Sequence, residues 1–167
     1  GKNNVLSSLL ASNGMSAENV SLSVDNDSLF NIKGDVLHFQ SGDTRLDTLS
    51  FSALQHSRFL IYKASLGNEP GTMDAFAKVD INGYVARDKI SVFAKQQNIE
   101  GKQGFNLGAI TSIGDSVINV KLVPLTPMIG YKNWTVNKDN FIDYNFYNHH
   151  FDANVQLVSQ QSHLKLY

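Results

Sequence analysis

Hydrophobic and polar side chains alternate along most of the chain with a period of two, beginning at about Asn19. The clearest runs of apolar positions, each separated by one intervening residue, are Val79, Ile81, Gly83 and Val85; Ile90, Val92 and Ala94; Phe105, Leu107 and Ala109; Ile118, Val120 and Leu122; Ala153, Val155 and Leu157; and Leu164 and Leu166. Successive side chains of a strand point to opposite faces of a sheet. Each run therefore predicts a β-strand with one apolar face.

Turn-forming residues separate these runs. The breaks are Ser41-Gly42-Asp43, Gly67-Asn68-Glu69-Pro70-Gly71, Arg87-Asp88-Lys89, Gly101-Lys102, Gly114-Asp115 and Asn137-Lys138-Asp139-Asn140. Short connections between strands, with no helical pattern between them, predict an all-β fold, an antiparallel meander of many strands. The one helical pattern is Leu6, Leu9 and Leu10, followed by Asn13-Gly14, and it predicts a short N-terminal helix.

Alternation shows that each strand has an apolar face but not what covers that face. A two-sheet sandwich and a single sheet bent into a groove predict the same pattern. Glycines within or beside the strands, at Gly83, Gly108 and Gly130, favour bends and hence the bent sheet.

Composition and charge restrict the function. The 167 residues, 42% of them hydrophobic and 17% charged, are typical of one folded domain. Fourteen Lys and Arg residues are scattered among fifteen Asp and Glu residues, which leaves a formal charge of −1 and argues against a nucleic-acid partner. The absence of cysteine excludes disulfides, thiolate metal sites and cysteine nucleophiles.

No motif predicts catalysis, a metal or a cofactor. The five histidines lack the spacing that would direct two imidazoles at one metal ion. Asp25-Asn26-Asp27 and Asn137-Lys138-Asp139 begin like a calcium loop, but both lack its glycine and are expected to be turns. Ser162 and Lys165 fall on opposite faces of a strand, and the carboxylates, such as Asp74 and Asp80, show no catalytic spacing. We therefore expect a protein that is not an enzyme.

Two aromatic stretches remain. The only tryptophan, Trp134, precedes Asn137-Lys138-Asp139-Asn140, which is followed by an aromatic run from Phe141 to Tyr147. We interpret this as a hairpin with aromatic cross-strand pairs. The stretch Phe59–Tyr62 is apolar at every position, which predicts a central strand that is covered on both faces.

The order of several phrases resembles the TamB family of the AsmA-like superfamily. These phrases are "FNIKGDVLHF", "GDTRLDTLSFSALQ", "YKASLGNEPGTMDAFAKVDINGYVARDKISV", "QNIEGKQGFNLGA" and "WTVNKDNFIDYNFYNHHFDANVQLVSQ". The last is similar to a recurring Trp-x-Val-Asn-x-x-Asn-x-Ile-x-Tyr phrase of that family, and together the phrases span most of the chain.

The resemblance implies a fold, a location and a role. Residues 1–167 would be one all-β segment of a larger periplasmic protein, the translocation and assembly module subunit that is anchored in the inner membrane. The sheet of such proteins, a β-taco, forms a trough with an apolar interior. The family is associated with phospholipid transport and with outer-membrane protein assembly, so the implied partners are phospholipid or another apolar ligand and an outer-membrane assembly protein.

In this reading acyl chains lie against the apolar faces of the strands, where each CH₂ group removed from water contributes about 0.8 kcal/mol. The residues expected to line the groove are Val79, Ile81, Val92, Leu107, Val120, Leu122, Val155 and Leu157. Two alternatives stay open. These positions also suit a closed core, and the chain also suits a carbohydrate- or protein-binding β-sandwich that uses Trp134 and Tyr131 as surface contacts.

Overall fold

The computed structural model describes residues 11–27, 29–68, 77–160 and 162–167, which form one sheet. Its thirteen strands are β1 (Met15–Asp25), β2 (Asn31–Ser41), β3 (Thr44–His56), β4 (Phe59–Gly67), β5 (Lys78–Val85), β6 (Lys89–Gln97), β7 (Gln103–Ile113), β8 (Val117–Ile129), β9 (Lys132–Asn133), β10 (Thr135–Val136), β11 (Phe141–Asn145), β12 (Phe151–Val158) and β13 (His163–Leu166).

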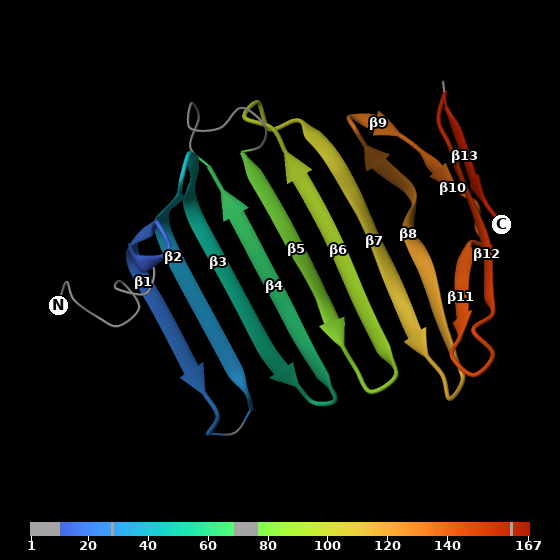
Figure 1. Cartoon of the computed structure of the whole chain (residues 1–167), viewed down its shortest axis with the longest axis horizontal. Coiled ribbons are helices and arrows are strands. Elements are labelled where there is room, and N and C mark those ends of the chain that lie inside the picture. Colours follow the sequence, from blue (N-terminus) through green and yellow to red (C-terminus); the bar gives the residue numbers. More distant parts are fainter. Residues whose placement is uncertain (1–10, 28, 69–76, 161) are drawn as a thin grey trace.

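Strands β1 to β8 follow one another across the sheet in chain order, each antiparallel to the next (Figure 1). The order continues through β11 and β12, β13 pairs with the far side of β12, and β1 and β13 do not pair with each other. The sheet is thus an open meander, as the alternation and turn signals predicted. Several turns also lie where they were predicted, including the one after β2, where Gly42 has a φ of 56°.

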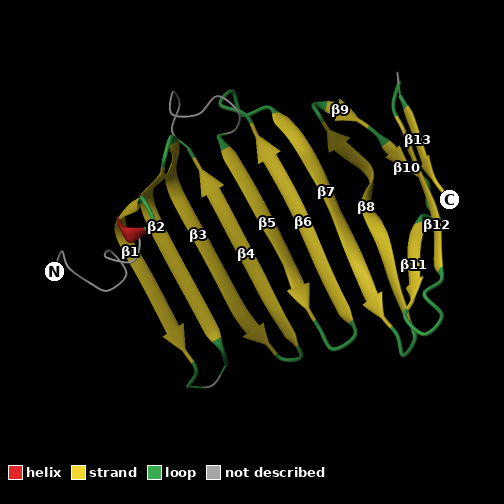
Figure 2. Ribbon diagram, in the orientation of Figure 1, coloured by secondary structure: helices red, strands yellow, loops and turns green. Residues whose placement is uncertain are grey.

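Only the end of the predicted N-terminal helix can be compared with the structure. Leu6, Leu9 and Leu10 lie outside the described residues, whereas Ala11 and Ser12 are helical (Figure 2). Gly14 then adopts a φ of +68°, the left-handed conformation that commonly ends a helix, and β1 begins at Met15.

The pairing register divides the side chains of the sheet between two faces. On one face, rows of apolar residues run straight across the strands, one of them through Phe51, Ala64, Ile81, Ala94 and Leu107. We call this side the apolar face. On the other side the central rows consist mainly of Ser, Lys, Asp and Asn residues, with Phe93 among them, and we call it the polar face. Leu54, Ile61 and Tyr84 form an apolar row on this face, close to the turns that follow β3 and β5.

The sheet curls at its C-terminal end, where β11, β12 and β13 turn away from the plane of β3 to β7 (Figure 1). The buried core of the molecule lies there: Val136, Val155 and Leu157 are 2%, 5% and 9% exposed. Leu122 and Ile142 pack against this core from β8 and β11, on the apolar face. The apolar face is therefore on the inner side of the curl.

Strand β4 corrects one prediction. It is a central strand, between β3 and β5, as expected. It is not covered on both faces, because Phe59 and Ile61 on the polar face are exposed, while Leu60 and Tyr62 on the apolar face are half-buried. The uninterrupted apolar stretch reflects the local Phe59–Tyr84 edge-to-face contact, with ring centroids 5.8 Å apart, rather than a second layer.

Gly83 lets an aromatic side chain lie flat across the apolar face. A Cβ atom at this position would collide with the carbonyl oxygen of Ser91 and with the hydroxyl of Tyr62. Without that atom, the Tyr62 side chain crosses β5 and its hydroxyl donates to the Ser91 carbonyl of β6 at 2.7 Å. Burial raises the pKa of Tyr62, as expected for a phenol removed from water.

Candidate functional site

The apolar face of β2 to β7 is the candidate site. Four consecutive rows on it contain no charged side chain: Val36, Leu49, Leu66, Val79, Gln96 and Phe105; Gly34, Phe51, Ala64, Ile81, Ala94 and Leu107; Ile32, Ala53, Tyr62, Gly83, Val92 and Ala109; and Gln55, Leu60, Val85, Ile90 and Thr111. At about 4.8 Å between strands and about 6.7 Å between rows, the surface measures about 24 Å across the strands and about 20 Å along them.

This surface is accessible. Phe51, Val92 and Ile90 are 41%, 40% and 37% exposed. Because all strands of the described residues belong to one sheet, no second layer from this part of the chain covers the face. A continuous apolar surface of this size is comparable to the largest apolar patch on a typical monomer, and such a patch is often an interaction surface.

All eight residues predicted to line a groove lie on the apolar face, but in two different environments. Val79, Ile81, Val92 and Leu107 lie on the open surface. Leu122 packs against the buried core, and Val155 and Leu157 belong to it, as the closed-core interpretation requires. Val120 lies between the two environments, beside Ile142 of β11.

The hairpin predicted between Trp134 and Tyr144 does not form. Val136 of β10 pairs with β12, whereas β11 pairs with both β8 and β12. Strands β9, β10 and β11 are thus pieces of one interrupted strand that runs between β8 and β12. The turn chemistry was read correctly, but the residues on either side of the turn pair with other strands and not with each other.

Two asparagine side chains bridge the interruption. On the β8 side, Asn140, which is 2% exposed, accepts the Leu122 N–H at 2.7 Å and donates to the Leu122 carbonyl at 3.4 Å. On the β12 side, Asn137 accepts the Gln156 N–H at 2.9 Å and donates to the Asn154 carbonyl at 3.1 Å. Each amide replaces the backbone of the missing strand, because a primary amide carries the same donor and acceptor as a peptide unit.

Asp139 completes this bridge. Its carboxylate accepts the Asn154 amide at 2.9 Å and the Asn137 amide at 3.1 Å. Hydrogen bonds from its own backbone N–H and from the Asn137 side chain lower the pKa of Asp139, since they stabilise the charged form. The Asn-x-Asp-Asn sequence is therefore a structural device of the sheet.

Trp134 and Tyr131 do not together form an exposed aromatic platform. Trp134 is half-buried against the core, and its indole N–H donates to the Ile129 carbonyl at 3.2 Å. Tyr131 is exposed, with the Lys102 ammonium 5.4 Å from its ring centroid. The two rings thus differ in environment. Neither the single sheet nor the position of Trp134 matches the sandwich module considered from the sequence.

Nothing in the sequence indicated that Asn137 and Asn140 act through their side chains. Their only visible signal was two asparagines three residues apart around a turn, which is also the signal of an ordinary hairpin. The calcium-like Asp25-Asn26-Asp27 is a turn in which the Asp27 N–H donates to the Asp25 carboxylate at 3.1 Å.

Among the described residues, no three His, Asp or Glu side chains are grouped so that they could hold a metal ion. No helix in this part of the chain combines the length and the apolar character needed to cross a bilayer.

Comparisons of the chain with protein-family models, with curated proteins and with solved structures find no match.

Proposed function

We propose that the chain is a non-enzymatic segment of a periplasmic envelope protein similar to the TamB family, anchored to the inner membrane elsewhere in its sequence. Its apolar face supports phospholipid acyl chains during transport between membranes or during outer-membrane protein assembly. One observation carries the proposal: four uncharged rows of side chains, each crossing five or six strands of a single-layer sheet, remain accessible.

The chemistry of the surface favours acyl chains over a polar ligand. The polar groups in the four rows are the side chains of Gln55, Tyr62, Gln96 and Thr111. The Tyr62 hydroxyl already donates to Ser91, so it is not free to direct a ligand. A surface with so few directional groups holds a ligand by removing apolar area from water, which is how hydrocarbon chains bind.

The curl of the sheet supports the same occupant. The apolar face lies on the inner side of the curl, next to the core residues Val136 and Leu157. Acyl chains on β3 to β7 would therefore have the packed C-terminal end of the sheet beside them, which removes further apolar area from water.

Site-specific photo-crosslinking tests the proposal. A benzophenone side chain replaces Leu107 or Val92 on the apolar face, and matched control variants carry it at Asn106 or Phe93, the neighbouring positions on the polar face. After irradiation with labelled phospholipid vesicles, we expect several-fold more lipid label at Leu107 and Val92 than at the two controls. Equal labelling of both faces, or labelling of neither, would rule out the apolar face as a lipid surface.

A further inference from the structure

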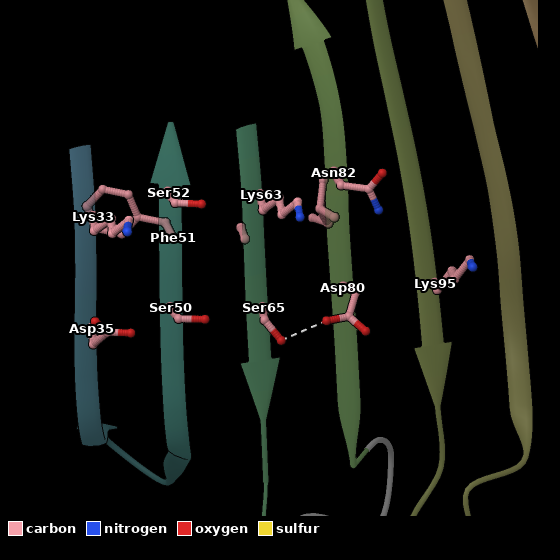
Figure 3. Close-up of a pocket in the computed structure, with 12 residues that line it drawn as sticks. Lys33, Asp35, Ser50, Phe51, Ser52, Lys63, Ser65, Asp80, Asn82 and Lys95 are labelled. Atoms are coloured by element: carbon pink, nitrogen blue, oxygen red, sulfur yellow. Dashed lines mark hydrogen bonds between the residues drawn. The ribbon is translucent and has the colours of Figure 1, made fainter. Parts of the chain in front are cut away.

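The polar face carries a second candidate site, independent of the lipid surface. A hollow of about 630 Å³ lies over β2 to β6 (Figure 3). Its lining from the polar face is Lys33, Asp35, Ser50, Ser52, Lys63, Ser65, Asp80, Asn82 and Lys95. A hollow of this volume is in the range of small-molecule sites.

The register arranges these side chains in two rows. Lys33, Ser52, Lys63 and Asn82 lie opposite one another on β2, β3, β4 and β5. In the adjacent row, Asp35, Ser50, Ser65, Asp80 and Lys95 continue to β6. Figure 3 shows both rows: the first holds two lysines, a serine and an asparagine, and the second holds two aspartates, two serines and Lys95.

In the part of the chain that the structure describes, the lysines of the first row, and Lys95 of the second, have no ion-pair partner: no carboxylate lies within ion-pair distance of Lys33, Lys63 or Lys95. The Asp80 carboxylate, in contrast, is neutralised by Lys78 at 3.1 Å and accepts the Ser65 hydroxyl at 2.8 Å. Lys33 and Lys63 flank the half-buried Ser52, with about 9.6 Å between their strands, so both flexible ammonium groups can reach one oxyanion above the Ser52 hydroxyl.

The second row offers acceptors for hydroxyl groups. Asp35 is exposed, and from the described residues its carboxylate accepts one long hydrogen bond, 3.4 Å, from the Ser21 hydroxyl. It lies beside the Ser50 hydroxyl, one row from Lys33 and Ser52. Carboxylates bind hydroxyl donors well but repel an anion. The two rows together therefore favour a ligand that carries both an oxyanion and hydroxyl groups.

We propose that this hollow binds a phosphorylated polyol or sugar, with its phosphoryl group between Lys33 and Lys63 and its hydroxyls directed to Asp35 and Ser50. Such a group occurs both in soluble sugar phosphates and in polyol lipid headgroups. The two sources share the chemistry that the hollow recognises.

Calorimetric titration with glucose 6-phosphate, glucose and inorganic phosphate tests the chemistry. We expect glucose 6-phosphate to bind more tightly than either of its parts. The double variant Lys33→Gln/Lys63→Gln should weaken binding of glucose 6-phosphate by about tenfold or more, since each lysine supplies a charge-assisted hydrogen bond to the phosphoryl group. The control Lys138→Gln/Lys165→Gln, which removes the same charge far from the hollow, should change it little.

A second variant should change the binding of the two ligands in opposite directions. Asp35→Asn should weaken binding of glucose 6-phosphate, because a hydroxyl acceptor loses its charge, and strengthen binding of inorganic phosphate, because a repulsive charge is removed. Equal losses in the two lysine double variants, or a change of the same sign for both ligands in Asp35→Asn, would overturn the assignment.

Vesicles distinguish the source. A lipid headgroup is supported if the chain prefers vesicles that contain phosphatidylinositol to vesicles of pure phosphatidylcholine, and if Lys33→Gln/Lys63→Gln loses this preference. This outcome supports a lipid headgroup whether or not glucose 6-phosphate also binds. Binding of glucose 6-phosphate alone supports a soluble ligand. Binding of neither probe refutes the proposal. Because all the substituted side chains are exposed, circular dichroism of each variant should match that of the original chain.

Discussion

The open sheet of β2 to β7 and the curled end formed by β8 to β13 are built from the same alternating sequence pattern but are stabilised differently. At the curled end, Val136, Val155 and Leu157 are buried, and asparagine side chains replace missing backbone. In the open sheet, residues in equivalent positions, such as Val92 and Ile90, keep more than a third of their surface exposed.

The difference shows that alternation alone does not define a core. A strand with period-two hydrophobicity becomes buried only where the sheet curls on itself, as it does at β10 and β12. Where the chain runs on in simple hairpins, the same pattern leaves a surface. Stability should therefore be concentrated at the curled end, and accessible apolar area in the open sheet.

The largest expected contrast comes from placing a charge at matched valines. Val155→Asp puts an unpaired carboxylate in the core and should reduce the free energy of unfolding by about 3 kcal/mol or more. Val92→Asp, on the open surface, should reduce it by less than about 1 kcal/mol. The change in Val155→Asp is measured by urea denaturation, monitored by the fluorescence of Trp134, which packs against the core. Circular dichroism of both variants measures the change in Val92→Asp.

Similar losses in the two variants would show that the open sheet is covered in solution. Val92→Asp should also lower lipid crosslinking at Leu107 while leaving the fold intact. Retention of full crosslinking would contradict the proposed lipid surface.

Asn140→Ala should have the next largest effect. It leaves the Leu122 N–H without its acceptor in a half-buried environment and removes the donor to the Asn137 carbonyl at 3.0 Å. The loss of one such group costs about 1–3 kcal/mol, so we expect a decrease of about 2 kcal/mol in the free energy of unfolding. Trp134 fluorescence in urea measures it.

Asn148→Ala is the control for this prediction, because Asn148 is exposed and its side chain accepts only the His150 N–H in a turn. A decrease for Asn140→Ala no greater than that for Asn148→Ala would show that the interrupted strand does not depend on the amide bridge.

The smallest effect is expected in the open sheet. Tyr62→Phe removes the donor to the Ser91 carbonyl but keeps the ring over Gly83, so the free energy of unfolding should fall by about 0.5–1.5 kcal/mol. Circular dichroism in urea checks this change. Tyr84→Phe is the control, since the Tyr84 ring also packs in the sheet. If both variants lose the same stability, the hydroxyl bond of Tyr62 contributes nothing measurable.

The sequence predicted much of the open sheet because its hairpins are local. Each turn, such as Gly42-Asp43, joins two strands that pair with each other, so pattern and turn chemistry determine the pairing together. The faces of Ile81 and Leu107 follow from the same period of two, which is why the eight groove candidates share one face.

Prediction was less successful where two strands that are consecutive in the chain do not pair with each other. The turn around Lys138 looks local, but β10 and β11 pair with β8 and β12, and only the positions of Asn137 and Asn140 in space reveal their role. Likewise, the apolar stretch Phe59–Tyr62 could not distinguish burial on two faces from an exposed aromatic contact. The polar hollow depends on register between four hairpins and had no signal in the sequence.

Because β1 to β8 lie side by side in chain order, the number of hairpins sets the width of the sheet. Each strand contacts only the strands beside it, so inserting or deleting one hairpin would change the span by about 9.6 Å without repacking a core. Duplication of hairpins can thus widen the sheet while the curled end keeps its own packing.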